Sequence, residues 1–208
     1  MKIRPQHFSR ALFGLLLGLG FAGCGGGGEI QVYIVAPLPS RVKAPAHWRE
    51  VPRKKIAEDV AQSLLRAGLS KSDPSFSRMR MDMTDSIKQR FAIVHTGSDS
   101  NATATLTVLP FDAKSPDALS NSRQRNVNRW RRKVGLPGLE DAALKDALKM
   151  VPGLPEEARL LDARGESNRI LGVLVPFNRS LWVYTLTGAP EAVGLERDAF
   201  LKLLPDWR

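Results

Sequence analysis

Six basic side chains and no acid stand close together in one short stretch of the chain: Arg123, Arg125, Arg129, Arg131, Arg132 and Lys133. Positive charge at this density predicts a surface for an anion, such as a phosphorylated glycolipid, an anionic phospholipid, an acidic polymer or an acidic partner. The alternative is an ordinary solvated helix face whose positive charge is partly balanced by three nearby acidic residues: Glu140, Asp141 and Asp146.

A helix is expected over residues 116–134, because Ser115 is suited to cap it and Pro116 to its first position. At about 100° per residue, one face carries Val127, Trp130 and Val134. The opposite face carries four bases: Arg125, Arg129, Arg132 and Lys133. Arg123 and Arg131 lie near the apolar stripe, where their stems can follow it. The helix is therefore expected to dock through its apolar stripe and present the four bases outward.

Asn126 and Asn128 lie within this helix and are candidates for contact with an anion or a partner. Their alternative role is to satisfy backbone groups of a nearby turn. Catalytic motifs are not found: no nucleophile elbow frames a serine, and no glycine-rich phosphate loop follows a strand. No metal or cofactor is expected, since only two histidines, His47 and His95, remain after the leader and the single cysteine, Cys24, is not expected to join them in a zinc site. The pattern favours a protein that is not an enzyme, with a hydrolase of unrecognised site as the weaker alternative.

The N-terminus has the marks of a secretory signal peptide over residues 1–23. Lys2, Arg4 and Arg10 form a basic start, and residues 11–22 are almost wholly apolar. A membrane-spanning helix needs roughly 20 apolar residues, so cleavage is favoured over a permanent span. Without this leader, the chain would have 185 residues and a net charge of +7 instead of +10.

The sequence Phe21-Ala22-Gly23-Cys24 contains the only cysteine and resembles the lipobox of bacterial lipoproteins. The resemblance implies a diacylglyceryl thioether on Cys24, cleavage just before it and acylation of the new amino group, palmitate included. Phe21 departs from the pattern, in which leucine is commonest. The alternative is ordinary cleavage after Ala22, which leaves a free thiol. A buried structural cysteine fits poorly, because four glycines follow.

The same resemblance implies that the protein is located in the cell envelope. Two or three acyl chains hold a protein on a bilayer far better than one does, and residues 25–28 supply a flexible glycine tether. In this family an aspartate directly after the lipidated cysteine favours the inner membrane. Gly25 stands there, so the periplasmic face of the outer membrane is expected. Nucleic acid also favours basic helices, but an exported protein rarely meets it and none is expected as a partner.

Residues 24–45 are expected to form the anchor, tether and extended lead-in, with a strand at 29–36, and residues 46–208 a single domain. Period-two patterns predict strands at 90–96, 102–110, 159–163, 169–176 and 180–187. Helices are expected at 54–67, 116–134, 140–150 and from Pro190 onward, with a loop at 70–77. Strands with short links and helices between and after them predict an α+β domain with a mainly antiparallel sheet. Trp48, Trp130 and Trp182 are expected in or beside its core.

The block Asn126-Val127-Asn128-Arg129-Trp130-Arg131 resembles one found in uncharacterised secreted or lipid-anchored bacterial proteins. Weaker matches to that pattern cover most of residues 46–204, and the helix at 54–67 departs from it as an insertion. The family's layout is similar to the α/β/α sandwiches of PsbP-like and DcrB-like envelope proteins. Since fold alone does not imply function, the expected function is a lipid-anchored envelope protein of interaction or accessory type. The alternative is an anionic-ligand or glycolipid-binding module that uses the basic helix.

Overall fold

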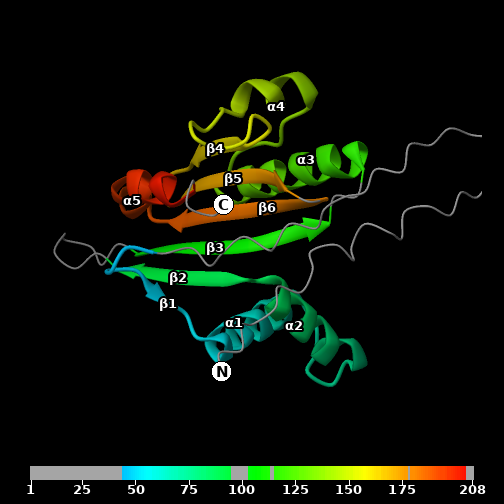
Figure 1. The fold of residues 1–208 in the computed structure, drawn as a ribbon. Helices are drawn as coiled ribbons and strands as arrows, with labels where there is room; N and C mark the ends of the chain where they lie inside the picture. Colours follow the sequence, from blue (N-terminus) through cyan, green and yellow to red (C-terminus); the bar gives the residue numbers. More distant parts are fainter. Residues whose placement is uncertain (1–43, 95–102, 113–114, 178, 205–208) are drawn as a thin grey trace, which may run out of the picture. The chain divides into compact units, whose positions relative to one another are not determined.

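The computed structural model describes residues 44–94, 103–112, 115–177 and 179–204, all of which belong to one compact unit, residues 35–208 (Figure 1). The signal peptide, Cys24, the glycine tether, the expected strand at 29–36 and His95 lie outside these described residues.

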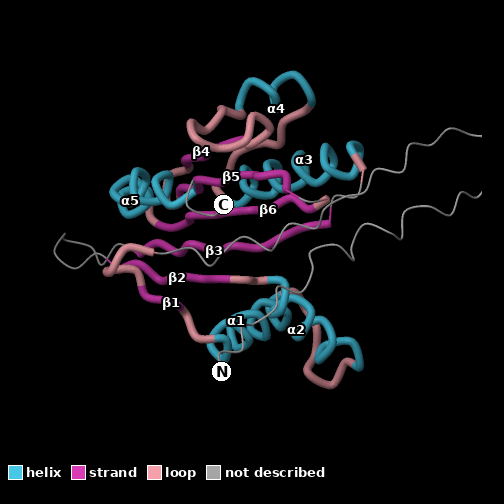
Figure 2. Tube along the Cα trace, in the orientation of Figure 1, coloured by secondary structure: helices cyan, strands magenta, loops and turns pink. Residues whose placement is uncertain are grey.

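The strands form one antiparallel sheet in the order β1-β2-β3-β6-β5-β4 (Figure 2). Their bounds are Arg49–Glu50 for β1, Gln89–Val94 for β2, Thr103–Asp112 for β3, Arg159–Arg164 for β4, Arg169–Phe177 for β5 and Ser180–Gly188 for β6. The predicted α+β class and mainly antiparallel sheet are confirmed, and each of the five strands expected within the domain is present. Only the two-residue edge strand β1 was not expected, because it is too short for a pattern.

The helices are Arg53–Arg66 (α1), Pro74–Ser86 (α2), Pro116–Lys133 (α3), Asp141–Ala147 (α4) and Pro190–Leu203 (α5). α3 begins as expected: Pro116 is at its start, and the Ser115 hydroxyl accepts a hydrogen bond from the Ala118 N–H at 3.1 Å. α4 ends earlier than the expected residue 150, because Lys149 instead pairs with Leu160 of β4.

The expected loop over residues 70–77 is wrong in its second half, where α2 begins. Asp73 caps this helix by accepting a hydrogen bond from the Ser75 N–H at 2.8 Å, and Pro74 takes its first position. The hydrogen bonds from Ser75 lower the pKa of the Asp73 carboxyl. Pro74 therefore begins a helix, although a loop was expected over this segment.

Alternation along the strands gives the sheet two covered faces. On one face, Phe91, Leu106 and Tyr184 join a core that also contains Val193 and Phe200 of α5. On the other face, α3 covers β5 and β6 through Val127, Trp130 and Val134. The pair α1 and α2 covers the β2 side of this second face, since Leu109 of β3 packs against both the α1–α2 cluster and the α3 cluster. Helices therefore pack on both sides of the sheet, as a sandwich-like arrangement requires.

The three tryptophans expected in the core, Trp48, Trp130 and Trp182, are all buried. The Trp130 indole packs directly against Gly172 of β5, which has no side chain to obstruct it. A Cβ atom built on Gly172 would lie 2.1 Å from Cζ3 of the indole. The closeness of this contact fixes the position of α3 on β5, and with it the direction in which the polar residues of α3 point.

Candidate anion-binding site

A pocket of about 450 Å³ opens beside α3, on the side that faces β3. One aromatic ring of β3 and five polar residues of α3 line it: Phe111, Ser122, Arg125, Asn126, Arg129 and Arg132. Four of these six were expected at the site from the sequence. A volume of this size is within the usual range for small-ligand sites.

Arg129 is exposed, as expected for the outward face of α3, but two contacts within the protein orient its guanidinium group. Its guanidinium carbon lies 5.7 Å from the centroid of the Phe111 ring, within the range of a cation–π contact. The same guanidinium donates a hydrogen bond to the side-chain oxygen of Asn126 at 2.6 Å. These two contacts hold the Arg129 guanidinium beside α3 and over Phe111, near the end of β3.

Asn126 is buried and fully engaged. Its amide nitrogen donates to the backbone oxygen of Ser122 at 2.8 Å, which leaves the side-chain oxygen directed at Arg129. Ser122 is also buried, and its hydroxyl accepts a hydrogen bond from Arg125 at 3.3 Å. The two small polar residues thus position two guanidinium groups at one pocket. Asn126 therefore holds the Arg129 guanidinium in place and does not itself line the pocket with a free polar group.

The bases of the pocket have no acidic partner among the residues that the structure describes. Within the described ranges, no carboxylate lies at salt-bridge distance from Arg125, Arg129, Arg132 or Lys133. The acids nearest in sequence also form no ion pair with these four bases in the described part of the chain: Glu140, Asp141 and Asp146. Arg169 offers a contrast, since it makes a two-pronged contact to Asp162 at 2.9 and 2.6 Å that raises its pKa.

Lys133 continues the line of bases one turn beyond Arg129. Desolvation lowers the pKa of its ammonium group, and the charges of Arg129 and Arg90 lower it further. Desolvation also lowers the pKa of Arg129. Like charges that are crowded and partly removed from water are relieved when an anion binds between them. The electrostatics therefore favour an anion at this place.

The remaining basic and amide residues of α3 have structural partners. Asn128 pairs with the backbone of Leu139, donating at 3.0 Å and accepting at 2.7 Å, and so holds the turn after the helix. Arg131 donates to the Pro137 oxygen at 2.7 Å. Arg123 donates to the Glu157 oxygen at 3.3 Å, and its burial lowers its pKa. None of these three residues lines the pocket, and Asn128 takes the turn-stabilising role that was the alternative for it.

Three contributors were missed from the sequence: Phe111, Ser122 and Arg90. Phe111 follows Pro110 in the alternating pattern of β3, so its position on the threonine face could have been found by extending that pattern two residues. Ser122 is one turn before Asn126, and nothing in its type distinguishes it from a solvent-facing serine. Arg90 is distant in sequence, and only the pairing of β2 with β3 brings it near α3.

The described residues contain no group of three or more His, Cys, Asp or Glu side chains arranged to hold a metal ion. In the same part of the chain, none of the helices is both long and apolar enough to cross a membrane.

The fold and site define an α+β protein with a cationic pocket beside one helix. No family model matches the chain. A search of curated proteins likewise finds no significant match.

Proposed function

We propose that this protein is a lipid-anchored protein of the cell envelope, not an enzyme, whose folded domain binds an anionic group in the pocket beside α3. One observation carries the binding proposal: three guanidinium groups without acidic partners in the described part of the chain line a single pocket. Hydrogen bonds between guanidinium and phosphate or carboxylate are charge-assisted and often two-pronged, which gives both affinity and orientation.

The envelope address is supported by the sequence of residues 1–28. Acyl chains on Cys24 would hold the protein at a membrane, and the glycine tether would let the domain reach nearby headgroups or partners. The outer membrane is favoured because Gly25 follows the cysteine. An anionic lipid headgroup, a glycolipid or an acidic envelope protein would all lie within reach of the pocket.

A protein partner is the second candidate, and a different surface favours it. α2 exposes Met79 and Met83, which are four residues apart and share one face of the helix, while Met81 is exposed on the other side. Methionine side chains are flexible and polarizable and are common on adaptable protein-binding surfaces. Binding through this surface would not depend on the arginines of α3, so the variants described next separate the two candidates.

The anion-binding proposal is tested with the mature chain, residues 24–208, carrying Cys24→Ser so that no acyl chain contributes. Arg125→Gln, Arg129→Gln and Arg132→Gln together should reduce retention on vesicles containing phosphatidylglycerol by at least about 30-fold. This is about 2 kcal/mol, which the loss of only one or two charged hydrogen bonds at about 1.5 kcal/mol each already accounts for. Retention of the unsubstituted chain should fall steeply as salt is added. Co-sedimentation over a range of lipid concentrations measures both effects.

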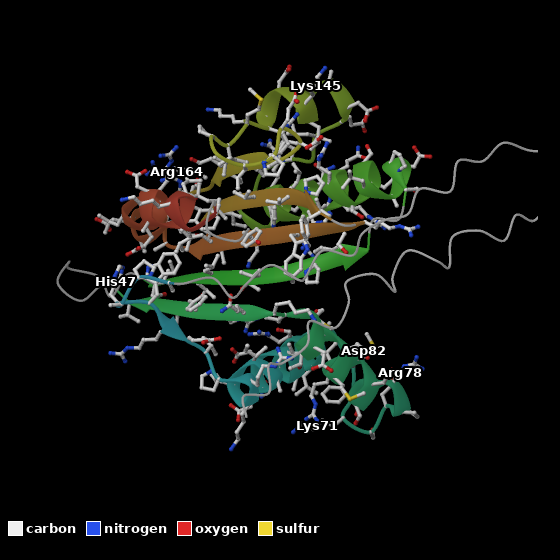
Figure 3. The ribbon with its side chains drawn as sticks, viewed as in Figure 1. His47, Lys71, Arg78, Asp82, Lys145 and Arg164 are labelled. Atoms are coloured by element: carbon white, nitrogen blue, oxygen red, sulfur yellow. The ribbon has the colours of Figure 1, made fainter. Side chains whose placement is uncertain are left out.

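The matched control removes three positive charges elsewhere. Lys71, Lys145 and Arg164 are exposed, lie on other elements and are outside the pocket (Figure 3). Replacing these three by glutamine should leave retention within about two-fold of the unsubstituted chain, since distant surface charges are screened. Equal losses in the two triple variants would show only a response to net charge, and unchanged retention in the α3 variant would refute the pocket.

The anchor is tested by intact-mass measurement of the protein extracted from membranes of its own cells. We expect a chain that begins at Cys24 and carries the added mass of two or three acyl chains. In the Cys24→Ser variant that added mass should be absent, and the protein should leave the membrane fraction. An unmodified N-terminus on the native protein would contradict the lipid anchor while leaving the pocket untouched.

A further inference from the structure

A row of polar side chains crosses the sheet on the same face as the anion pocket. Arg90 of β2 pairs in register with Thr107 of β3, which pairs with Thr185 of β6. Neighbouring strands are about 4.8 Å apart, so the row spans roughly 10 Å. Thr107 and Phe111 are four residues apart on β3 and therefore point to the same side of the sheet. The row and the pocket therefore lie on the same face of the sheet, with Leu109 between Thr107 and Phe111 on β3.

A second pair of threonines lies beside this row, since Thr105 of β3 pairs with Thr187 of β6. All four threonines are half-buried. Among the described residues, no hydrogen-bond partner is found for any of their four hydroxyls. None of the four hydroxyls is among the buried side-chain groups that lack a partner in the described structure, so these hydroxyls reach solvent and are open to a ligand.

Two cations join the threonines to the pocket. Arg90 contacts Asp59 of α1 through Nη1 at 3.3 Å, while its Nε is buried without a hydrogen-bond partner in the described structure. Lys133 lies close enough to both Arg90 and Arg129 for their charges to lower its pKa. Arg129 is already part of the pocket. Lys133 therefore lies between the pocket and Arg90, whose own charge is paired with that of Asp59.

We infer that the threonine row is a second subsite next to the anion pocket, and that the ligand is a phosphorylated sugar in which a polyhydroxyl ring adjoins the phosphate. The arginines of α3 hold the phosphate, and the threonines exchange hydrogen bonds with ring hydroxyls. An acyl chain would leave the hydroxyls unpaired, so the surface suits a headgroup and not a lipid tail. This inference rests on the proposed anion-binding function.

The test compares two lipids that each carry one phosphodiester charge, phosphatidylinositol with its hydroxylated ring and phosphatidylglycerol without one. The mature chain with Cys24→Ser should bind phosphatidylinositol vesicles about five-fold more tightly at equal mole fraction. Thr107→Val with Thr185→Val should abolish this preference, because valine keeps the shape and the strand propensity but removes the hydroxyl. Binding to phosphatidylglycerol should stay unchanged. Thr103→Val, at the exposed end of β3, is the control and should keep the preference.

Competition with soluble inositol 1-phosphate and with inorganic phosphate tests whether the hydroxylated ring itself is recognised when no lipid tail is present. Stronger competition by the sugar phosphate is expected whichever source supplies the ring. Each valine variant is also made singly, and thermal unfolding confirms that at least one remains folded. Equal binding of the two lipids by the unsubstituted chain, or a preference that survives a folded valine variant, would overturn the sugar inference alone. Failure to bind either vesicle would instead refute the proposed function.

Discussion

Replacing Gly172 by alanine is expected to lower the free energy of unfolding by about 3 kcal/mol, toward the upper end of what overpacking usually costs. The new methyl group would lie 2.1 Å from Cζ3, 2.4 Å from Cη2 and 2.5 Å from Cε3 of the Trp130 indole. The ring is buried and rigid, and β5 is paired on both sides, so neither partner moves easily. Urea unfolding followed by circular dichroism measures the loss.

Gly138→Ala is the matched control, because its methyl group would meet Asn128 at an ordinary 3.5 Å. This variant should stay within about 0.5 kcal/mol of the unsubstituted protein. Trp130→Leu supplies a second check, since it removes the aromatic ring that Gly172→Ala would strike. In that background Gly172→Ala should cost less than half as much, which a double-mutant cycle detects. Full additivity of the two substitutions would contradict the contact.

Much of this fold could be predicted from local patterns. The five longer strands follow from period-two alternation, and α3 follows from its serine cap, its proline and its apolar stripe. α2 was missed for a physical reason. Residues 78–83 read Arg-Met-Arg-Met-Asp-Met, a period of two that is not helical. The helix forms because Phe76 packs against α1 and Asp73 caps the first turn, and the first of these depends on tertiary contact.

The sequence predicted which basic residues lie together on α3, but not the directions of their side chains. Spacing on a helix placed Arg125, Arg129 and Arg132 together, as found at the pocket. The direction of Arg129 could not be predicted, because Phe111 attracts it from another element and Asn126 accepts its hydrogen bond. Helix periodicity describes only the helix itself. Which neighbour lies beside each face is set by long-range packing, here the seating of Trp130 on Gly172.

Replacing Glu196 by alanine should also cost about 3 kcal/mol of unfolding free energy, at a place far from the pocket. Glu196 is a buried carboxylate on α5 that accepts a hydrogen bond from Nε1 of Trp48 at 2.8 Å and pairs with Nε2 of His47 at 2.8 Å. Both partners precede β1, so this side chain joins the start of the described chain to the last helix. Alanine would leave the buried Trp48 N–H without an acceptor, which alone costs about 1–3 kcal/mol, and would open a cavity.

Three comparisons make this prediction specific. Glu196→Gln keeps one oxygen that can accept from Trp48, so it should cost clearly less than Glu196→Ala. Trp48→Phe removes the donor, and in that background Glu196→Ala should lose much of its effect, because no indole N–H is left unpaired. Asp198→Ala, on the same helix but almost fully exposed, should change stability by less than about 0.5 kcal/mol. Equal costs for Glu196→Ala and Asp198→Ala in urea unfolding would show that the buried carboxylate does not hold residues 47–48 to α5.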